Sequence, residues 1–149
     1  MTQKVHAILA VIFSGFFLLL DQLLKWIARA SLDAEFGWRW FGWEYFENSG
    51  IALSLPFPNW LIVALTPLIV FLFFLVLLRH GRVRTPFFVW GVIFIITGAS
   101  SNYIDRLLFE VTIDYLRIAT AIINLADLMI LFGALLVLKD GARKKPERI

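Results

Sequence analysis

Four long apolar runs dominate the pattern of hydrophobic and polar residues along the chain. They cover about residues 5–28, 60–78, 86–108 and 122–138. About 20 apolar residues cross a hydrocarbon core of about 30 Å, so each run predicts a membrane-spanning helix. We therefore expect an all-α membrane protein that consists of one domain, residues 1–149, built on four spanning helices.

The segment between the first two runs, residues 29–59, is dense in aromatic side chains. Trp38 and Trp40 are two positions apart, as are Trp43 and Tyr45, and this period of two is typical of short strands. Tryptophan and tyrosine also favour the headgroup level of a bilayer. We expect the segment to lie on the outer membrane surface. The periodicity alone favours a simple aromatic anchor over the alternative, a small β-sheet that cradles a substrate.

Composition and charge support a bilayer as the solvent and predict an orientation. The chain is 60% hydrophobic, which is too apolar for a soluble domain of this size, and it has no cysteine, which excludes a disulfide or a cysteine nucleophile. Its net charge of +3 comes largely from the turn at residues 79–84 and the basic tail at 139–149, so it gives no reason to expect a nucleic-acid partner. The positive-inside rule places these segments and both termini in the cytoplasm, and residues 29–59 and 110–121 outside. The tail is expected to touch anionic lipid.

Polar side chains within the runs fall at one predicted depth. An ionisable side chain at mid-bilayer costs about 2.5–3.5 kcal/mol, so each one needs a reason. Under the predicted orientation these side chains all lie in the outer part of their helices, which predicts one polar site near the outer face. They are Asp21 and Lys25 in the first run, Asn102, Asp105 and Arg106 in the third, and Asn124 and Asp127 in the fourth.

Asp114 and Asp127 are the best candidates for chemistry. Two carboxylates in a poorly solvated site repel each other, so one holds a proton, and the pair can then activate water and protonate a leaving amine. Asp21 and Asp105 each have a nearby cation in sequence, Lys25 and Arg106 respectively, which favours a permanently ionised, structural role. Arg117 would neutralise Asp114 only if the stretch between them were helical.

Other chemistries are less well supported. Both histidines fall on the cytoplasmic side, away from the polar residues, which argues against a serine–histidine triad or a histidine-ligated zinc. A serine–lysine dyad of Lys25 with Ser49, Ser100 or Ser101 stays open, although Asp21 lies one turn away and favours a charged lysine. A proton-coupled transporter would need polar residues across the whole bilayer, and here they stop in its outer half.

Four sequence blocks occur in an order that is typical of one family. They are DQLLK at residues 21–25, NSGIALS at 48–54, GASSNYIDR at 98–106, and IDY at 113–115 together with NLAD at 124–127. In these blocks the chain resembles signal peptidase II, the lipoprotein signal peptidase. The resemblance covers essentially the whole chain.

The resemblance implies an aspartyl endopeptidase of the bacterial inner membrane, with four helices, a small periplasmic sheet and a site near the periplasmic face. Such enzymes need no metal and remove the signal peptide from diacylglyceryl-modified prolipoproteins, and the antibiotic globomycin is an expected inhibitor. A relative that binds lipidated protein without cleaving it is the remaining alternative. The catalytic pair carries over to Asp114 and Asp127. Supporting positions carry over to Asp21, Lys25, Asn48, Gly50, Asn102, Arg106 and Asn124, with Asp105 beside them.

Overall fold

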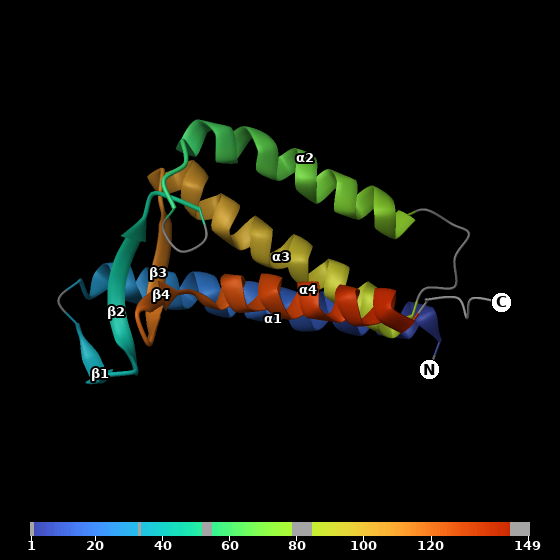
Figure 1. Ribbon diagram of the computed structural model, residues 1–149, viewed down its shortest axis with the longest axis horizontal. Coiled ribbons are helices and arrows are strands. Elements are labelled where there is room, and N and C mark those ends of the chain that lie inside the picture. The colour runs from blue at the N-terminus through green and yellow to red at the C-terminus, as the bar shows by residue number, and fades with distance from the viewer. Residues whose placement is uncertain (1, 33, 52–54, 79–84, 144–149) are drawn as a thin grey trace.

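The computed structural model describes residues 2–32, 34–51, 55–78 and 85–143. Four helices form a bundle, and an antiparallel sheet of four strands closes one end of it (Figure 1). α1 begins and α4 ends at the opposite end. The helices are α1 (Gln3–Ala30), α2 (Asn59–Leu78), α3 (Pro86–Phe109) and α4 (Leu125–Arg143), and the strands are β1 (Phe36–Trp38), β2 (Phe41–Asn48), β3 (Thr112–Ile118) and β4 (Ala121–Ile123).

Three of the four helices are long and apolar enough to cross a membrane. These are α1, α2 and α3, and every residue of α2 is at least partly exposed, as expected for a helix that faces lipid. α4 has only 19 residues and contains Asp127, Lys139 and Asp140, so unlike the longer α1 it has no 18-residue stretch with two or fewer charged side chains. The expectation of spanning helices is therefore confirmed for the first three runs.

The fourth helix differs most from its predicted range. It begins at Leu125, because residues 121–123 form β4, and it continues to Arg143. The prediction of a separate tail over residues 139–149 is therefore wrong for the first five of them. The rest of that tail, residues 144–149, and the predicted basic turn at 79–84 lie outside the described residues.

Packing explains why the helix extends into the predicted tail. The ammonium of Lys139 lies 4.9 Å from the centre of the Phe87 ring, a cation–π contact with the start of α3. The Thr85 hydroxyl, at the N-cap of α3, donates a hydrogen bond to the buried carboxylate of Asp140. Both contacts fix the last turns of α4 against α3.

α3 and α4 approach each other closely because glycines face the neighbouring backbone. A Cβ atom at Gly98 would lie 2.6 Å from the carbonyl oxygen of Ala126, and one at Gly91 would lie 2.6 Å from that of Gly133. Both distances are too short for a side chain. Gly98 is thus a point of close helix approach, and the partner is α4.

The aromatic segment forms strands, so the simple anchor was an incomplete prediction. β1 and β2 pair antiparallel, and the sheet order is β1-β2-β3-β4. Gly37 has a φ of 130° and lies opposite Gly42, where a Cβ atom would meet the Gly42 Cα at 2.5 Å. In the β2–β3 register Phe46 lies opposite Asp114, and Asn48 lies opposite Thr112. The end of β2 is thereby placed beside the candidate aspartate of β3.

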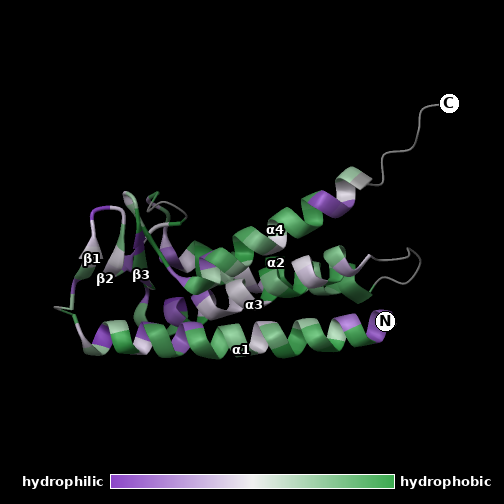
Figure 2. Ribbon diagram, turned by 90° about the horizontal axis from the view of Figure 1, so that it is seen from below, coloured by the Kyte–Doolittle hydropathy of each residue, from purple (hydrophilic) through white to green (hydrophobic). Residues whose placement is uncertain are grey.

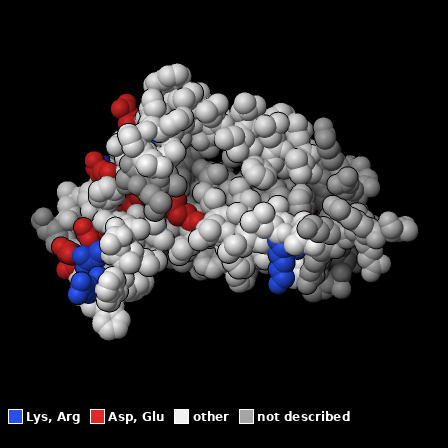
Figure 3. Space-filling view, viewed as in Figure 1, with Lys and Arg blue, Asp and Glu red and all other residues white. Residues whose placement is uncertain are grey.

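Hydrophilic residues gather at the sheet end of the molecule. Figure 2 shows them in the sheet and in the adjoining turns of α1 and α3, while the middle of the bundle is hydrophobic. On the face shown in Figure 3, the acidic atoms gather at the same end. Ala28 at the end of α1 packs with Ile113 and Tyr115 of β3 in a buried cluster that joins the bundle to the sheet.

Candidate active site

All ten predicted site residues lie in one polar cluster where the bundle meets the sheet. Eight of them are buried, and Asn102 and Asp127 are half-buried. The structure therefore brings together residues that are up to 106 positions apart. α1 supplies Asp21 and Lys25, the end of β2 and its following turn supply Asn48 and Gly50, α3 supplies Asn102, Asp105 and Arg106, β3 supplies Asp114, and the start of α4 supplies Asn124 and Asp127.

One asparagine side chain links the two candidate catalytic carboxylates. The Nδ2 of Asn124 donates a hydrogen bond of 2.6 Å to Oδ1 of Asp114. Its Oδ1 accepts a bond of 2.8 Å from the backbone N–H of Asp127, and its own backbone N–H donates to Oδ2 of Asp127 at 3.3 Å. This reciprocal arrangement is a capping box at the start of α4, so the local structure of the helix end fixes both carboxylates.

Asp114 is completely buried, and its environment favours a proton. Burial, followed by the negative charge of Asp127, raises the pKa of the Asp114 carboxyl to about 7. Hydrogen bonds from Asn48, at 3.1 Å, and from Asn124 act in the opposite direction. A carboxyl with this pKa can gain or lose a proton near neutral pH, as general acid–base catalysis requires.

Asp127 lies in a different environment. It is half-buried, so its side chain retains contact with the surroundings, whereas Asp114 has none. Its Oδ1 accepts a hydrogen bond of 2.8 Å from Nδ2 of Asn102. Its position in the first turn of α4 also favours negative charge, because the positive end of the helix dipole lies there. Two carboxylates in such unequal environments suit an acid–base pair.

Lys25 forms the centre of the buried cluster beside this pair. Its Nζ lies 2.8 Å from Asp21, 2.8 Å from Asp105 and 2.8 Å from Oδ1 of Asn102. The predicted pairing of Lys25 with Asp21 is confirmed. These three contacts use all three N–H groups of the ammonium, and none of the three partners is a serine. The geometry gives no support to the serine–lysine dyad.

Arg106 does not pair with its neighbour in sequence. It donates hydrogen bonds to the carbonyl oxygens of Ser49, at 3.3 Å, and of Gly50, and so holds the turn that follows β2. The cation that pairs with Asp105 is Lys25 instead, which corrects the expectation from sequence. Successive residues of a helix point in different directions, which explains the difference.

Arg117 does not neutralise Asp114. The two residues are three positions apart on a strand, so their side chains point to opposite faces of the sheet. Arg117 pairs instead with Glu35, at 3.0 Å, and with Glu44, at 3.2 Å. In the part of the chain that the structure describes, Asp114 forms no ion pair, although the charges of Arg106 and Lys25 act on it from beyond ion-pair distance.

Three further polar side chains complete the cluster. Ser101 was considered from the sequence only as a partner of Lys25 in a serine–lysine dyad, and Tyr115 and Gln22 were missed. The Tyr115 hydroxyl donates to Asp21 at 2.9 Å, and burial together with the charge of Asp21 raises the pKa of this phenol. Gln22 donates to Oγ of Ser101, at 2.9 Å, and to Asp105, at 3.2 Å. For Gln22 the available signal was a polar residue within an apolar run, whereas Tyr115 lies outside the runs and gave no such signal. Residues 52–54 of the second sequence block lie outside the described residues.

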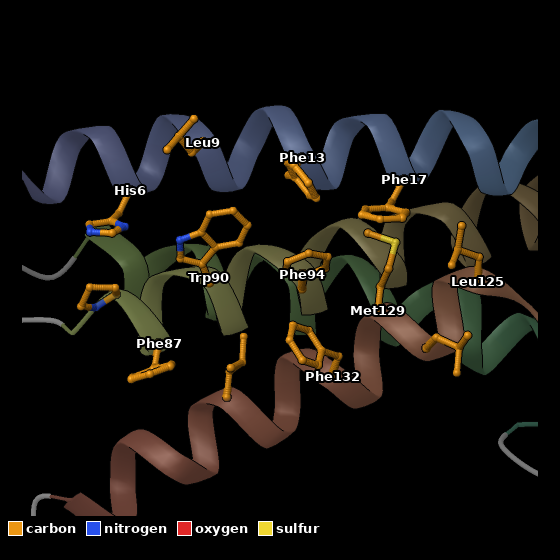
Figure 4. A pocket seen from close by; sticks show the side chains of 13 residues that line it. His6, Leu9, Phe13, Phe17, Phe87, Trp90, Phe94, Leu125, Met129 and Phe132 are labelled. Carbon is orange, nitrogen blue, oxygen red and sulfur yellow. The ribbon is translucent and has the colours of Figure 1, made fainter. Parts of the chain in front are cut away.

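An apolar groove leads away from the polar cluster along the bundle. It has a volume of about 670 Å³ and lies between α1, α3 and α4, with His6 at the far end (Figure 4). Aromatic side chains such as Phe13, Phe17 and Phe94 line it. Leu125 and Leu128, on either side of Asp127 in sequence, also line it, and Leu125 lies at the end opposite His6. The groove therefore extends to the first turns of α4, the helix that carries Asp127.

Comparison with known proteins assigns the chain to a family. The sequence model described as signal peptidase (SPase) II matches residues 13–142. The chain belongs to the signal peptidase II family. The lipoprotein signal peptidase of Bartonella bacilliformis is 37% identical over 134 residues, which cover 82% of this chain and 80% of that protein. That of Listeria monocytogenes is 27% identical over 131 residues, which cover 80% of this chain and 83% of the relative.

Solved structures show the same fold. Two structures described as bacterial membrane enzymes each superpose with a TM-score of 0.80. They share 21% and 18% sequence identity with this chain, and they cover 94% and 91% of it and 93% and 94% of their own chains. Signal peptidase II membership makes the protein a membrane protease of the family that removes signal peptides from prolipoproteins.

Proposed function

We propose that the protein is an aspartyl endopeptidase that uses Asp114 and Asp127 to cleave diacylglyceryl-modified prolipoproteins. The observation that carries this proposal is the pair of carboxylates that Asn124 links at 2.6 and 2.8 Å, one fully buried and one half-buried. Such a pair performs peptide hydrolysis without a metal.

The two environments suggest how the work is divided. Asp127, the more accessible carboxylate, takes a proton from water while the water oxygen attacks the scissile carbonyl carbon. Asp114, whose pKa of about 7 lets it hold a proton near neutrality, gives that proton to the departing nitrogen as the C–N bond breaks. The side-chain amide of Asn102 keeps the Asp127 carboxylate in place. Transfer of a proton from Asp127 back to Asp114 restores the starting state.

The protein is proposed to be a multi-pass protein of the bacterial inner membrane, with α4 as the fourth span. The charged residues of α4 lie at its two ends, with Asp127 in the first turn and Lys139 and Asp140 in the last turns. A helix of 19 residues is roughly 28 Å long, close to the hydrocarbon thickness. Together with the positive-inside rule, this supports an orientation with both termini in the cytoplasm and with the sheet and the dyad at the periplasmic face.

The apolar groove suits a lipid chain of the substrate. A transmembrane helix about 10 Å across and about 30 Å long would fill on the order of 2,000 Å³, well above the 670 Å³ of the groove. An acyl chain is thin enough to enter, and each of its buried CH₂ groups contributes about 0.8 kcal/mol. Because Leu125, two residues before Asp127 in the first turn of α4, lines one end of the groove, a chain lying there would keep the lipidated residue close to the dyad. Membrane lipids would occupy the groove between turnovers.

The proposal is tested by the dependence of cleavage on lipidation. Wild-type protein in liposomes is incubated with a diacylglyceryl-modified prolipoprotein or with its unmodified precursor, with and without globomycin, and products are resolved by a gel shift. We expect cleavage of the lipidated form alone, with inhibition by globomycin. Equal cleavage of both forms would contradict the proposed substrate class. Binding of the lipidated form without cleavage would identify a non-catalytic relative.

A further inference from the structure

The asparagine amides around the dyad are held in one orientation. The Oδ1 of Asn48 accepts from the backbone N–H of Gly50 at 3.0 Å, and the Oδ1 of Asn124 accepts from that of Asp127 at 2.8 Å. A backbone N–H can only donate, so each amide must present its oxygen there and turn its NH₂ group the other way. In both cases the NH₂ group donates to the Asp114 carboxylate.

Asn102 is held in the same manner, but by a side chain from another helix. Its Oδ1 accepts from the Lys25 ammonium at 2.8 Å, and its Nδ2 donates to Asp127 at 2.8 Å. An ammonium has three donors and no acceptor, so it fixes the orientation of the amide as firmly as a backbone N–H does. Among the described residues, the hydrogen bonds that connect Lys25 to Asp127 therefore run through Asn102.

The other contacts of Lys25 keep it suited to this task. Asp21 and Asp105 take the two remaining N–H groups, and the lysine side chain is only 3% exposed. These two carboxylates, each 2.8 Å from Nζ, hold the end of the lysine side chain in place, so that its third N–H points at the Asn102 oxygen.

We propose that Lys25 is a positioning residue for the Asp127 carboxylate and acts by locking the side-chain amide of Asn102. If the Asn102 amide flipped, so that its oxygen and its NH₂ group exchanged places, the oxygen would face the Asp127 carboxylate. Two acceptors would then repel each other where a hydrogen bond now lies. The helices would keep their packing, but Asp127 would lose a donor. This inference rests on the proposed function, because it assigns Lys25 a role in that dyad beyond stabilising the bundle.

The first test observes the amide directly and needs no substrate. Side-chain NH₂ signals of the ¹⁵N-labelled protein are recorded by NMR in detergent, and that of Asn102 is assigned by its absence in Asn102→Leu. In the wild type we expect a signal that is strongly protected from hydrogen exchange, and in folded Lys25→Met we expect that protection to be lost. The matched control is Gln22→Leu, which removes hydrogen bonds to Ser101 and Asp105 but none to Asn102. It should leave the signal unchanged.

The second test separates positioning from stability by kinetics. For the lipidated substrate, Lys25→Met and Asn102→Leu should each lower kcat by about 100-fold, the usual effect of removing one donor from a catalytic charge, and change KM by less than about threefold. Because both changes remove the same hydrogen bond to Asp127, the double variant should be no slower than the slower single variant. In Gln22→Leu/Asn102→Leu, by contrast, the fold-loss in kcat should equal the product of the losses in the two single variants.

The proposal would be overturned by an unchanged Asn102 signal in folded Lys25→Met. It would also be overturned if the fold-losses in kcat of Lys25→Met and Asn102→Leu multiplied in the double variant. If Lys25→Met does not fold, Lys25→Met/Asp105→Asn is compared with Asp105→Asn, since the pair of changes leaves the net charge of the cluster as it is. If that variant also fails to fold while Asn102→Leu folds, Lys25 is a structural cation and the proposal is wrong. Absence of cleavage by wild-type protein would contradict the proposed function alone, and the NMR comparison would still decide the role of Lys25.

Discussion

At the residue scale, the two carboxylates differ in what surrounds them, and this difference defines the chemistry. Asp114 is enclosed by β2, β3 and the start of α4 and receives side-chain donors from Asn48 and Asn124. Asp127 stays partly accessible. Burial therefore gives Asp114 a raised pKa and leaves Asp127 as the carboxylate that water can reach.

The raised pKa of Asp114 predicts the pH dependence of cleavage. As the proton donor, Asp114 is active in its protonated form, which is present below its pKa of about 7 and lost as the pH rises through that value. We expect kcat/KM for the lipidated substrate in liposomes to fall about tenfold per pH unit above that range. A rate that stays level or rises between pH 7 and pH 9 would show that Asp114 does not donate the proton.

The site residues could be predicted from the sequence, but several of their partners could not. Polar side chains in apolar runs stand out, because each is costly unless it has a function or a partner. Which partner each one has depends on the directions of side chains on packed helices. Asp105 and Arg106 are adjacent in sequence yet bind different parts of the molecule, Lys25 and the turn after β2.

At the element scale, the close contact of α3 with α4 determines where the dyad lies. Gly98 lets α4 approach at Ala126, next to Asp127, and Asn102 follows one turn later on α3. The hydrogen bond of 2.8 Å between Asn102 and Asp127 depends on this approach. The contact that holds the helices together therefore also holds the candidate site.

A single added methyl group should disturb this contact. Gly98→Ala is expected to destabilise the protein by roughly 1–3 kcal/mol through overpacking against Ala126. The higher helix propensity of alanine offsets roughly 1 kcal/mol of this loss. Gly15→Ala in α1, where a Cβ atom meets nothing within 4 Å, is the matched control and should be neutral or slightly stabilising. Thermal unfolding in detergent checks both variants. Equal unfolding temperatures would contradict the packing account.

The helices were predictable as elements, and strand β3 was not. The apolar runs identified the helices to within a few residues at most ends. In β3 the side chains of Ile113 and Tyr115 are buried in the core near Ala28, while Asp114 is buried in the site, so both faces are covered. The usual alternation of apolar and polar exposure is hidden in such a strand. Its partner β2 also lies about 70 residues earlier, and one sequence gives no signal for that pairing.

At the scale of the whole molecule, the candidate site lies at one end of a largely apolar bundle. The candidate site lies at the sheet end, and the groove of about 670 Å³ extends from it toward the opposite end, where α1 begins and α4 ends. This asymmetry suits an enzyme that keeps the lipid part of its substrate among the helices and cleaves the peptide at the membrane surface. It does not suit a relay of protons across the bilayer.

The most direct test of the central claim is cleavage of the lipidated substrate by variants of the dyad. Asp114→Asn and Asp127→Asn, each checked for wild-type folding, should lose at least about 1,000-fold in kcat, as expected for a residue that takes part in the reaction. Asp140→Asn changes a buried aspartate near the opposite end of α4 and is the matched control, which should stay within about tenfold of wild type once folded. Wild-type rates from either folded dyad variant would contradict the aspartyl mechanism.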